Sequence, residues 1–438
     1  MSEWSMDELK DWDEKICTMA KEYGLNWYEI DYEVIDYNEM ISAMAYTGLP
    51  THYRHWSFGK AYERTHTLYN AGVQGLPYEM IINTDPSIAY LMLENSMYIH
   101  ILTMAHCVGH SDFFKNNRMF AQTDAKNALI KFKAAAKYVR TLIEDPTVGI
   151  YEVEKIFDAC HAIKYQVPRF PGIKRLPPEE LKQLYAYRIS EDDSGKYDNF
   201  DLDKIPLERD YNLLAFIREH GRNLEEWQKN LIHIVEENSM YFIPQALTKI
   251  MNEGWAVLIH EKIVNDLGLP DKYHLPFIKL HNQVIRPQLG QINPYFLGYR
   301  IFKNIEKEYG FEECLLVREV HNDITFLRKY LTRELCDEMN LFSYSFKKEK
   351  GYKTIDDVSD EPGWEIIRDD LIKTVGLNSI PVVYVKEMKN DHTLTLTHEH
   401  DGRDLDIPYA KRVYEYVKSL WGDEVYLSTT LEGDDWEF

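Results

Sequence analysis

The chain has 438 residues, and its 50 Lys and Arg against 72 Asp and Glu give a formal net charge of −22 at pH 7. Such an acidic balance argues against nucleic acids and anionic membrane surfaces as partners, and no apolar run approaches the length of a membrane span. The N-terminus carries no signal-peptide pattern, and the five cysteines are scattered without a Cys-x-x-Cys pair, so we expect a soluble cytoplasmic protein with reduced thiols.

The dominant period up to about residue 335 is helical. Ser5 or Asp7 can cap a first helix, and Asp85-Pro86 has the pattern of an N-cap followed by proline at the first helical position. This pair predicts one long apolar helix that runs through Tyr90 and on to Ala105. Further helices are expected at residues 122–144, 151–163, 207–220, 224–240, 243–266 and 294–308, with one more from Phe311 to Asn340.

Two passages interrupt this helical pattern. Residues 166–178 are rich in proline and residues 190–203 are polar and acidic, so this region is expected to form a long surface excursion. Residues 281–298 contain two prolines and two glycines, which predict a second non-helical passage.

The pattern changes near residue 340. Short strands are expected at residues 341–347, 381–388, 393–398 and 424–430, with helices at 364–375 and 407–420. Strand, helix, strand, strand, helix, strand is the order of a ferredoxin-like α+β unit. The predicted fold is therefore mainly α, with a large helical N-terminal domain at residues 1–340 and a small C-terminal α+β domain at residues 341–438.

Two histidines stand out in the apolar segment Met104 to His110. His106 and His110 are four residues apart, which on a helix separates their side chains by only about 40° around the axis. Both imidazoles can therefore reach one metal ion. The alternative is a pair of polar histidines in the core or on the surface. No glycine-rich phosphate loop and no Gly-x-Ser-x-Gly elbow suggests a competing chemistry.

A carboxylate in a second apolar segment can complete such a site. Glu253 and His260 are seven residues apart, so they share one helical face to within about 20°. A buried, unpaired carboxylate costs roughly several kcal/mol, and a metal ion held by the two histidines would offset that cost. Two histidines on one helix and a glutamate on a later helix form a zincin-like layout, that of the glutamate-type zinc peptidases. The alternative is a structural ion pair of Glu253 with Lys249 or Lys262.

Further residues are candidates for the same site. His161, on a third predicted helix, and His260 are candidate additional metal ligands. Glu237 and Glu94 are the candidates for a catalytic general base, because Cys107 stands where a His-Glu-x-x-His protease carries its base. On a regular helix Glu94 lies about 120° from the first histidine of the pair, so it would need a kink to join the site.

Five stretches of the chain, in order, resemble the SpoVR family, stage V sporulation protein R. They are His55 to Lys60, Met104 to His110 with Phe113 to Asn117, Asp158 to Ala162, Met251 to Ala256, and Arg286-Pro287 with Ile292 to Tyr295. The resemblance covers about residues 5–335. It implies a link to assembly of the spore cortex, relatives in bacteria that do not sporulate, and a serine protein kinase and a von Willebrand-type protein as partners by gene neighbourhood. It implies no particular reaction.

Three functions compete at this point. The first is a metal-dependent hydrolase of peptidase or amidase type, with zinc or another divalent transition metal on His106, His110 and Glu253 and a bound water as nucleophile. The second is a non-catalytic scaffold or regulator whose metal is structural, which the absent base after His106 favours. The third is a carboxylate-bridged di-iron protein that recruits Glu94, Glu236, Glu237 and Glu253 together with the histidines.

Overall fold

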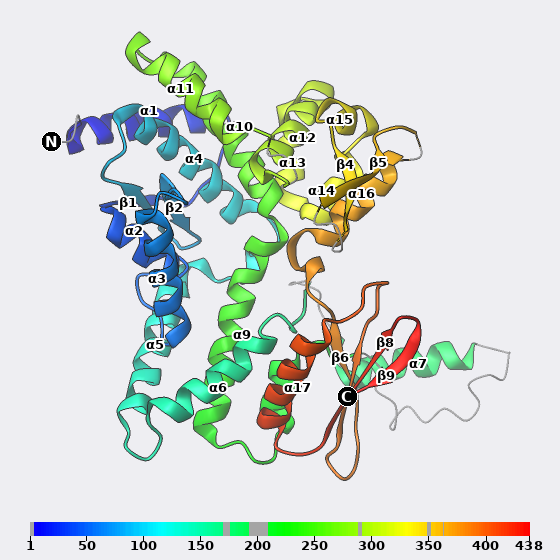
Figure 1. Ribbon diagram of the computed structural model, residues 1–438. Coiled ribbons are helices and arrows are strands. Elements are labelled where there is room, and N and C mark those ends of the chain that lie inside the picture. The colour runs from blue at the N-terminus through cyan, green and yellow to red at the C-terminus, as the bar shows by residue number, and fades with distance from the viewer. Residues whose placement is uncertain (1–3, 170–175, 192–208, 288–290, 348–351, 362) are drawn as a thin grey trace. The chain divides into compact units, whose positions relative to one another are not determined.

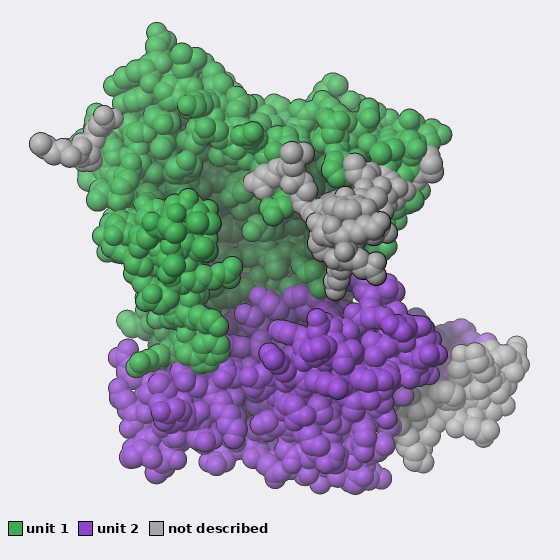
Figure 2. Space-filling view, viewed as in Figure 1, with its two compact units in different colours: residues 1–138, 242–379 green, residues 139–241, 380–438 purple. Residues whose placement is uncertain are grey.

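The computed structural model describes residues 4–169, 176–191, 209–287, 291–347, 352–361 and 363–438. The chain forms two compact units, coloured separately in Figure 2. Unit 1 comprises Met1–Tyr138 and Phe242–Ser379, and unit 2 comprises Val139–Tyr241 and Ile380–Phe438. Each unit is assembled from two separate stretches of chain, and residue 340 falls inside the second stretch of unit 1. Independent folding of residues 341–438 stays a prediction.

The structure is mainly helical, as the sequence predicts (Figure 1). Ser5 caps the first helix, since its side chain accepts a hydrogen bond from the backbone N–H of Glu8. Helices α5 (Ala125–Glu144) and α9 (Glu226–Leu247) contribute residues to both units. The other helices of unit 1 are α1 (Met6–Glu22), α2 (Tyr37–Ala45), α3 (Trp56–Asn70), α4 (Met97–Asn116), α10 (Lys249–Asp266), α11 (Asp271–Val284), α12 (Pro294–Tyr309), α13 (Phe311–Val320), α14 (Asp323–Tyr330), α15 (Arg333–Glu338) and α16 (Gly363–Thr374).

A three-stranded sheet in unit 1 has its middle strand in the segment predicted as one long helix. Its order is β1 (Ile30–Ile35), β3 (Ser87–Met92), β2 (Glu79–Ile82), with β3 parallel to β1 and antiparallel to β2. The prediction of a helix that starts at Asp85-Pro86 is therefore wrong. Most of β3 is buried, and a short continuous apolar run is as typical of an internal strand as of a buried helix. Helix α4 begins only after this strand, with Ser96 at its N-cap.

Helices α4, α10 and α12 pack at close range in the core of unit 1. A Cβ atom added to Gly109 of α4 would lie 2.7 Å from the Cα of Ala256 in α10. A Cβ atom added to Gly254 of α10 would lie 2.3 Å from the carbonyl carbon of Gly298 in α12. Only glycine permits this approach of one backbone to another. Because each of the first two glycines is the neighbour of a candidate ligand in the sequence, the packing draws the histidines of α4 toward the carboxylate of α10.

The segment Phe311 to Asn340 forms three short helices, α13, α14 and α15, where the sequence predicts one. Asn322 Oδ1 accepts a hydrogen bond from the backbone N–H of Thr325, at 3.0 Å, and so caps α14. Thr332 Oγ1 accepts from the backbone N–H of Leu335, at 3.3 Å, and caps α15. Each cap gives the first orphaned N–H groups of a helix a partner, so each starts a new helix within a continuous helical period.

Unit 2 combines helices with a four-stranded sheet. Its sheet has the order β6 (Val383–Met388), β7 (Leu394–His398), β8 (Val425–Leu431), β9 (Asp434–Glu437), with β7 and β8 parallel and the other pairs antiparallel. Its remaining helices are α6 (Gly149–Ile163), α7 (Pro178–Ser190), α8 (Leu213–His220) and α17 (Ile407–Trp421).

The predicted ferredoxin-like arrangement is wrong. Strand β4 (Phe342–Lys347), expected in the same sheet as the later strands, forms a separate two-stranded sheet with β5 (Tyr352–Val358). These two strands are close in sequence, and closing a short loop costs less entropy than pairing with a distant strand. The small C-terminal sheet domain itself is present, as predicted.

Two other expectations concern the breaks in the helical pattern. Of the predicted surface excursion, residues 170–175 and 192–208 lie outside the described residues, and the stretch between them contains α7. The second passage is shorter than predicted, because α11 extends to Val284 and α12 begins at Pro294, and residues 288–290 lie outside the described residues. A search of the described helices finds none with the length and apolar character needed to cross a membrane.

Candidate metal centre

The candidate ligands are carried by two helices that are buried along most of their length. In α4, every residue from His100 to Phe114 is buried, and the two histidines of the predicted pair are only 2% and 7% exposed. Glu253 follows the first turn of α10, whose start is anchored by Asp323: its carboxylate oxygens accept hydrogen bonds from the backbone N–H groups of Ile250 and Met251, both at 2.9 Å. A carboxylate at a helix N-terminus also interacts favourably with the helix dipole.

His106, His110 and Glu253 converge, so that one ligand atom of each lies within 4.8 Å of the others. Glu253 Oε2 is 3.7 Å from Nε2 of His106 and 3.4 Å from Nε2 of His110. Two ligands of one tetrahedral zinc ion, each at a bond length of about 2.1 Å, are separated by about 3.4 Å. The observed separations therefore fit atoms that share one ion.

The opposite ring nitrogens of both histidines already have partners. Asn252 Oδ1 lies 2.8 Å from Nδ1 of His110, and Nδ1 of His260 lies 3.0 Å from Nδ1 of His106. The asparagine oxygen can only accept, so His110 donates from Nδ1, and Nε2 carries the lone pair when the ring is neutral. Metal-binding histidines are commonly held in this way by an outer hydrogen bond.

The carboxylate of Glu253 has neighbours that lie too far away for good hydrogen bonds. Among the described residues, no hydrogen bond of good geometry reaches Oε2, although this atom is buried and its nearest ring nitrogen, Nε2 of His110, lies 3.4 Å away. Burial raises the pKa of Glu253, but the two histidines outweigh this effect and hold its pKa well below the ordinary value. Burial lowers the pKa of both histidines, and at His110 the neighbouring carboxylate of Glu253 outweighs burial and raises the pKa. The cluster thus favours an ionised carboxylate that faces two ring nitrogens.

Glu79 is a second carboxylate at this cluster, and the sequence reasoning missed it. Its Oε1 atom lies 4.0 Å from Nε2 of His106, and its side chain is 17% exposed. Burial raises the pKa of Glu79 to about 7, with His110 opposing the rise and Glu253 adding to it. The residue opens β2, a strand of four residues. The only indication in the sequence is that Glu79 directly precedes three apolar residues.

Tyr295 of α12 completes the surroundings of the cluster. Its ring stacks on the ring of His106, with centroids 6.1 Å apart and planes at 22°. The charge of Glu253 raises the pKa of the Tyr295 phenol, together with burial and Glu79, so the hydroxyl stays protonated. The site therefore offers one hydrogen-bond donor beside two carboxylates.

The structure places the other predicted residues of unit 1 outside this group. Glu94 is exposed in the turn that follows β3. Cys107 is fully buried, and burial raises the pKa of its thiol. His260 contacts the Nδ1 atom of His106, on the side of the ring away from Glu253, and is not one of the three converging residues. Lys262, considered as a partner for Glu253, pairs with Glu306.

Three predicted residues belong to unit 2. The ring of His161 stacks on Phe157, with centroids 5.9 Å apart. The carboxylate of Glu237 lies 3.9 Å from Nε2 of His233, and Glu236 pairs with Arg218 at 2.8 Å. The converging ligands are all contributed by unit 1.

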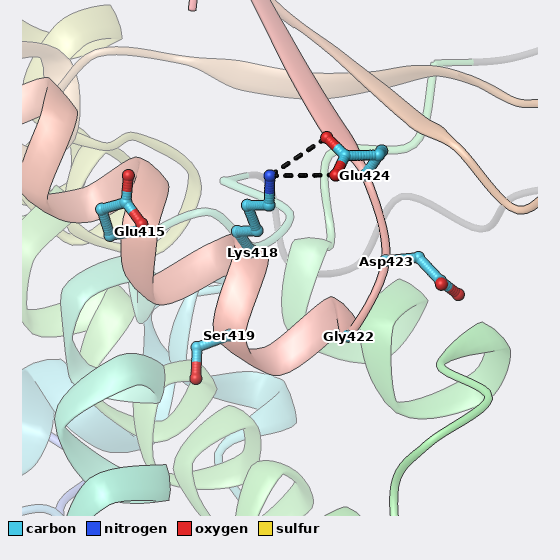
Figure 3. A pocket seen from close by; sticks show the side chains of 6 residues that line it. All are labelled: Glu415, Lys418, Ser419, Gly422, Asp423 and Glu424. Carbon is cyan, nitrogen blue, oxygen red and sulfur yellow. Dashed lines mark hydrogen bonds and ion pairs between the residues drawn. The ribbon is translucent and has the colours of Figure 1, made fainter.

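Unit 2 also has a surface pocket at the end of α17 (Figure 3). Its principal interaction is the ion pair of Lys418 with Glu424, whose Nζ and Oε2 atoms are 3.0 Å apart. The pocket is lined by Glu415, Lys418, Ser419, Gly422, Asp423 and Glu424. Because its one cationic side chain is paired within the pocket, this surface shows no ligand chemistry comparable to the cluster of unit 1.

Comparison with known proteins places these residues in a family. The chain matches the family described as SpoVR like protein over residues 3–380, and the SpoVR-like C-terminal domain over residues 379–432. It is 31% identical to the uncharacterized protein YcgB of Escherichia coli (strain K12), over 98% of this chain and 93% of that relative. A comparison with solved structures finds no significant match to the chain. The border between the two family matches coincides with the end of unit 1 at residue 379.

Proposed function

The chain belongs to the SpoVR-like family, and from this premise we propose that it is a metal-dependent hydrolase of peptidase or amidase type. His106, His110 and Glu253 are the proposed ligands of one divalent ion. The observation that carries the proposal is the buried Glu253 Oε2, which faces two ring nitrogens at 3.4 and 3.7 Å and receives no hydrogen bond of good geometry from the described residues. A carboxylate buried in this way needs a cation.

Zinc is the proposed ion. Two imidazole nitrogens and one carboxylate oxygen are the three protein ligands of a common type of catalytic zinc site, which leaves the fourth position for water or substrate. An ion bound there supplies Lewis-acid chemistry, polarising a carbonyl group and activating water at neutral pH.

Glu79 is the proposed general base, in the role that the residue after His106 cannot fill. Its Oε1 atom accepts a proton as water attacks the carbonyl carbon of an amide, and it returns this proton to the leaving nitrogen as the C–N bond breaks. In a His-Glu-x-x-His protease the general base lies on the same helix as the two histidines. In this proposal the base lies on strand β2, outside helix α4. The Tyr295 hydroxyl donates a hydrogen bond to the oxygen that gains negative charge.

Hydrolysis can be tested without knowledge of the natural substrate. Protein loaded with zinc is incubated with a mixture of peptides of known sequence, and new termini are identified by mass spectrometry. We expect new termini with the loaded protein, none after removal of zinc by a chelator, and recovery when zinc is restored. Zinc-loaded protein that produces no new termini would reject peptide hydrolysis.

The second candidate function is a scaffold with a structural ion. The distance of 4.0 Å between Glu79 Oε1 and His106 Nε2 favours it, because a fourth protein ligand would close the site to water. A ligand and a base respond differently to Glu79→Gln, since only the loss of a ligand weakens binding of the ion. That substitution therefore separates the two functions.

The proposal extends to the cellular setting that the family resemblance implies. A cytoplasmic hydrolase linked to assembly of the spore cortex would act on a precursor or on a regulatory protein. A serine protein kinase and a von Willebrand-type protein are the proposed partners. Co-purification of either protein with the untagged chain from its own cells would support this assignment, and its consistent absence would contradict it.

A further inference from the structure

Three imidazole rings form a buried chain that begins at the candidate metal centre. Nδ1 of His106 lies 3.0 Å from Nδ1 of His260, and Nε2 of His260 lies 2.9 Å from Nδ1 of His281. The rings come from α4, α10 and α11, and they are 2%, 0% and 8% exposed. Each contact joins two nitrogen atoms, so each requires one N–H donor and one lone pair.

Both contacts can be satisfied with all three rings neutral. A charged imidazole donates from both nitrogens, and two adjacent charged rings would set N–H against N–H. Burial of all three rings also disfavours the charged form. A neutral ring donates once and accepts once, so a donor set at one end of the chain fixes the tautomer of every ring that follows.

A metal ion at His106 selects one of the two directions. Binding through Nε2 requires a lone pair there, so the proton of His106 must lie on Nδ1 and be donated to His260. Nδ1 of His260 then accepts, its Nε2 donates to His281, and the last ring carries its proton on Nε2. The carboxylate of Glu261 acts on this last ring by its charge.

We propose that His260 and His281 are positioning residues that hold His106 in its metal-binding tautomer. The inference rests on the proposed metal site and adds residues that do not themselves touch the ion. In this arrangement Nδ1 of His260 accepts a hydrogen bond from His106, as the side-chain oxygen of Asn252 accepts one from His110. Outer hydrogen bonds of this kind commonly change metal affinity by about 10- to 100-fold.

Substitutions at His260 test the direction of the chain. His260→Leu removes the acceptor, whereas His260→Asn places an amide oxygen where Nδ1 stands and so keeps the acceptor for His106. The matched control is His100→Leu, which removes another buried histidine of α4, one that contacts Trp4 edge to face and lies outside the chain of three rings. All variants are full-length, and unfolding temperatures of the metal-free proteins report their folding.

The measurement is zinc affinity by competition with a chelator, together with the visible spectrum of the cobalt-substituted protein. We expect His260→Leu to weaken zinc binding about 10- to 100-fold, and His260→Asn to recover most of the loss. His281→Leu should give a smaller loss, and His100→Leu none. In 15N spectra of labelled histidine, the zinc-loaded protein should show His260 protonated on Nε2.

Two results would overturn the inference. One is zinc affinity of His260→Leu equal to that of the unchanged protein, and the other is a loss in His260→Asn as large as in His260→Leu. Failure of the metal site itself is distinguishable, because His106→Ala would then leave zinc affinity unchanged as well. If His106→Ala abolishes binding while His260→Leu does not, only the positioning role is rejected.

Discussion

Each unit of this protein holds a buried histidine close to a carboxylate, and the two arrangements differ in what they leave unpaired. In unit 2, Nδ1 of His392 lies 2.6 Å from Asp423 Oδ2, and its Nε2 lies 2.9 Å from the backbone oxygen of His220. The ring also stacks on Trp421 at 4.2 Å. Both nitrogens therefore have acceptors, and the residue ties three segments of unit 2 together.

In unit 1, the two Nε2 atoms and Glu253 Oε2 are spaced too widely for good hydrogen bonds and suitably for a shared ion. The residue types are similar in the two units, so histidine and carboxylate in proximity do not by themselves identify a metal site. What distinguishes the site of unit 1 is the partner that its buried atoms lack. Substitutions in each unit test this distinction.

The largest effect is expected from Glu253→Gln. The amide is nearly isosteric with the carboxylate but carries no charge and is a poorer ligand, so zinc affinity should fall by more than the roughly 100-fold that loss of an outer contact causes. Competition with a chelator measures this loss. Equal zinc affinity in Glu253→Gln and the unchanged protein would remove the carboxylate from the ligand set.

Glu79→Gln should separate catalysis from metal binding. Loss of a general base commonly lowers the rate by about 10²- to 10⁴-fold, so cleavage of any peptide that the zinc-loaded protein hydrolyses should fall by that factor while zinc affinity stays unchanged. Glu94→Gln and Glu237→Gln are the matched controls, and both should keep full activity. If zinc affinity falls together with activity, Glu79 is a fourth ligand, and this result would support the scaffold function instead of hydrolysis.

Asn252→Ala should weaken zinc binding about 10- to 100-fold, because His110 loses the acceptor that fixes its tautomer. Asn252→Asp, which keeps an oxygen at the same place, should retain most of the affinity. The same chelator competition compares the two variants. An alanine variant that binds zinc as tightly as the unchanged protein would show that His110 needs no outer partner.

The smallest effect on metal is expected in unit 2. His392→Leu should leave zinc content unchanged and destabilise the fold by about 2 kcal/mol, since it leaves acceptors on Asp423 and His220 without their donor. Metal analysis and chemical unfolding of the same preparation test both statements. Loss of zinc from this variant would show that the distinction between the two units does not hold.

Part of the site could be predicted from local spacing. Positions four apart on one helix place His106 and His110 on one face, and Glu253 was identified because a carboxylate in an apolar helix needs a partner. Glu79 could not be found in this way. It reaches the cluster because β2 pairs with β3, and strand pairing is decided by contacts that local spacing does not contain.

The fold shows the same limit. Periodicity identified most helices, yet it read β3 as part of α4, because a buried strand and a buried helix are both continuously apolar. The caps at Asn322 and Thr332 divide one predicted helix into three. His260 was expected as a ligand, and only the packing of α10 against α4 shows that it contacts His106 from behind.

The central claim is that His106, His110 and Glu253 hold one divalent ion. Its most direct test is the metal content of the protein, purified without a histidine tag, equilibrated with zinc and passed through a desalting column. Mass spectrometry of the elements should find one zinc per chain in the unchanged protein and almost none in Glu253→Gln or in the His106→Ala, His110→Ala double variant. An unchanged protein without stoichiometric metal, or variants that retain as much as it does, would contradict the account.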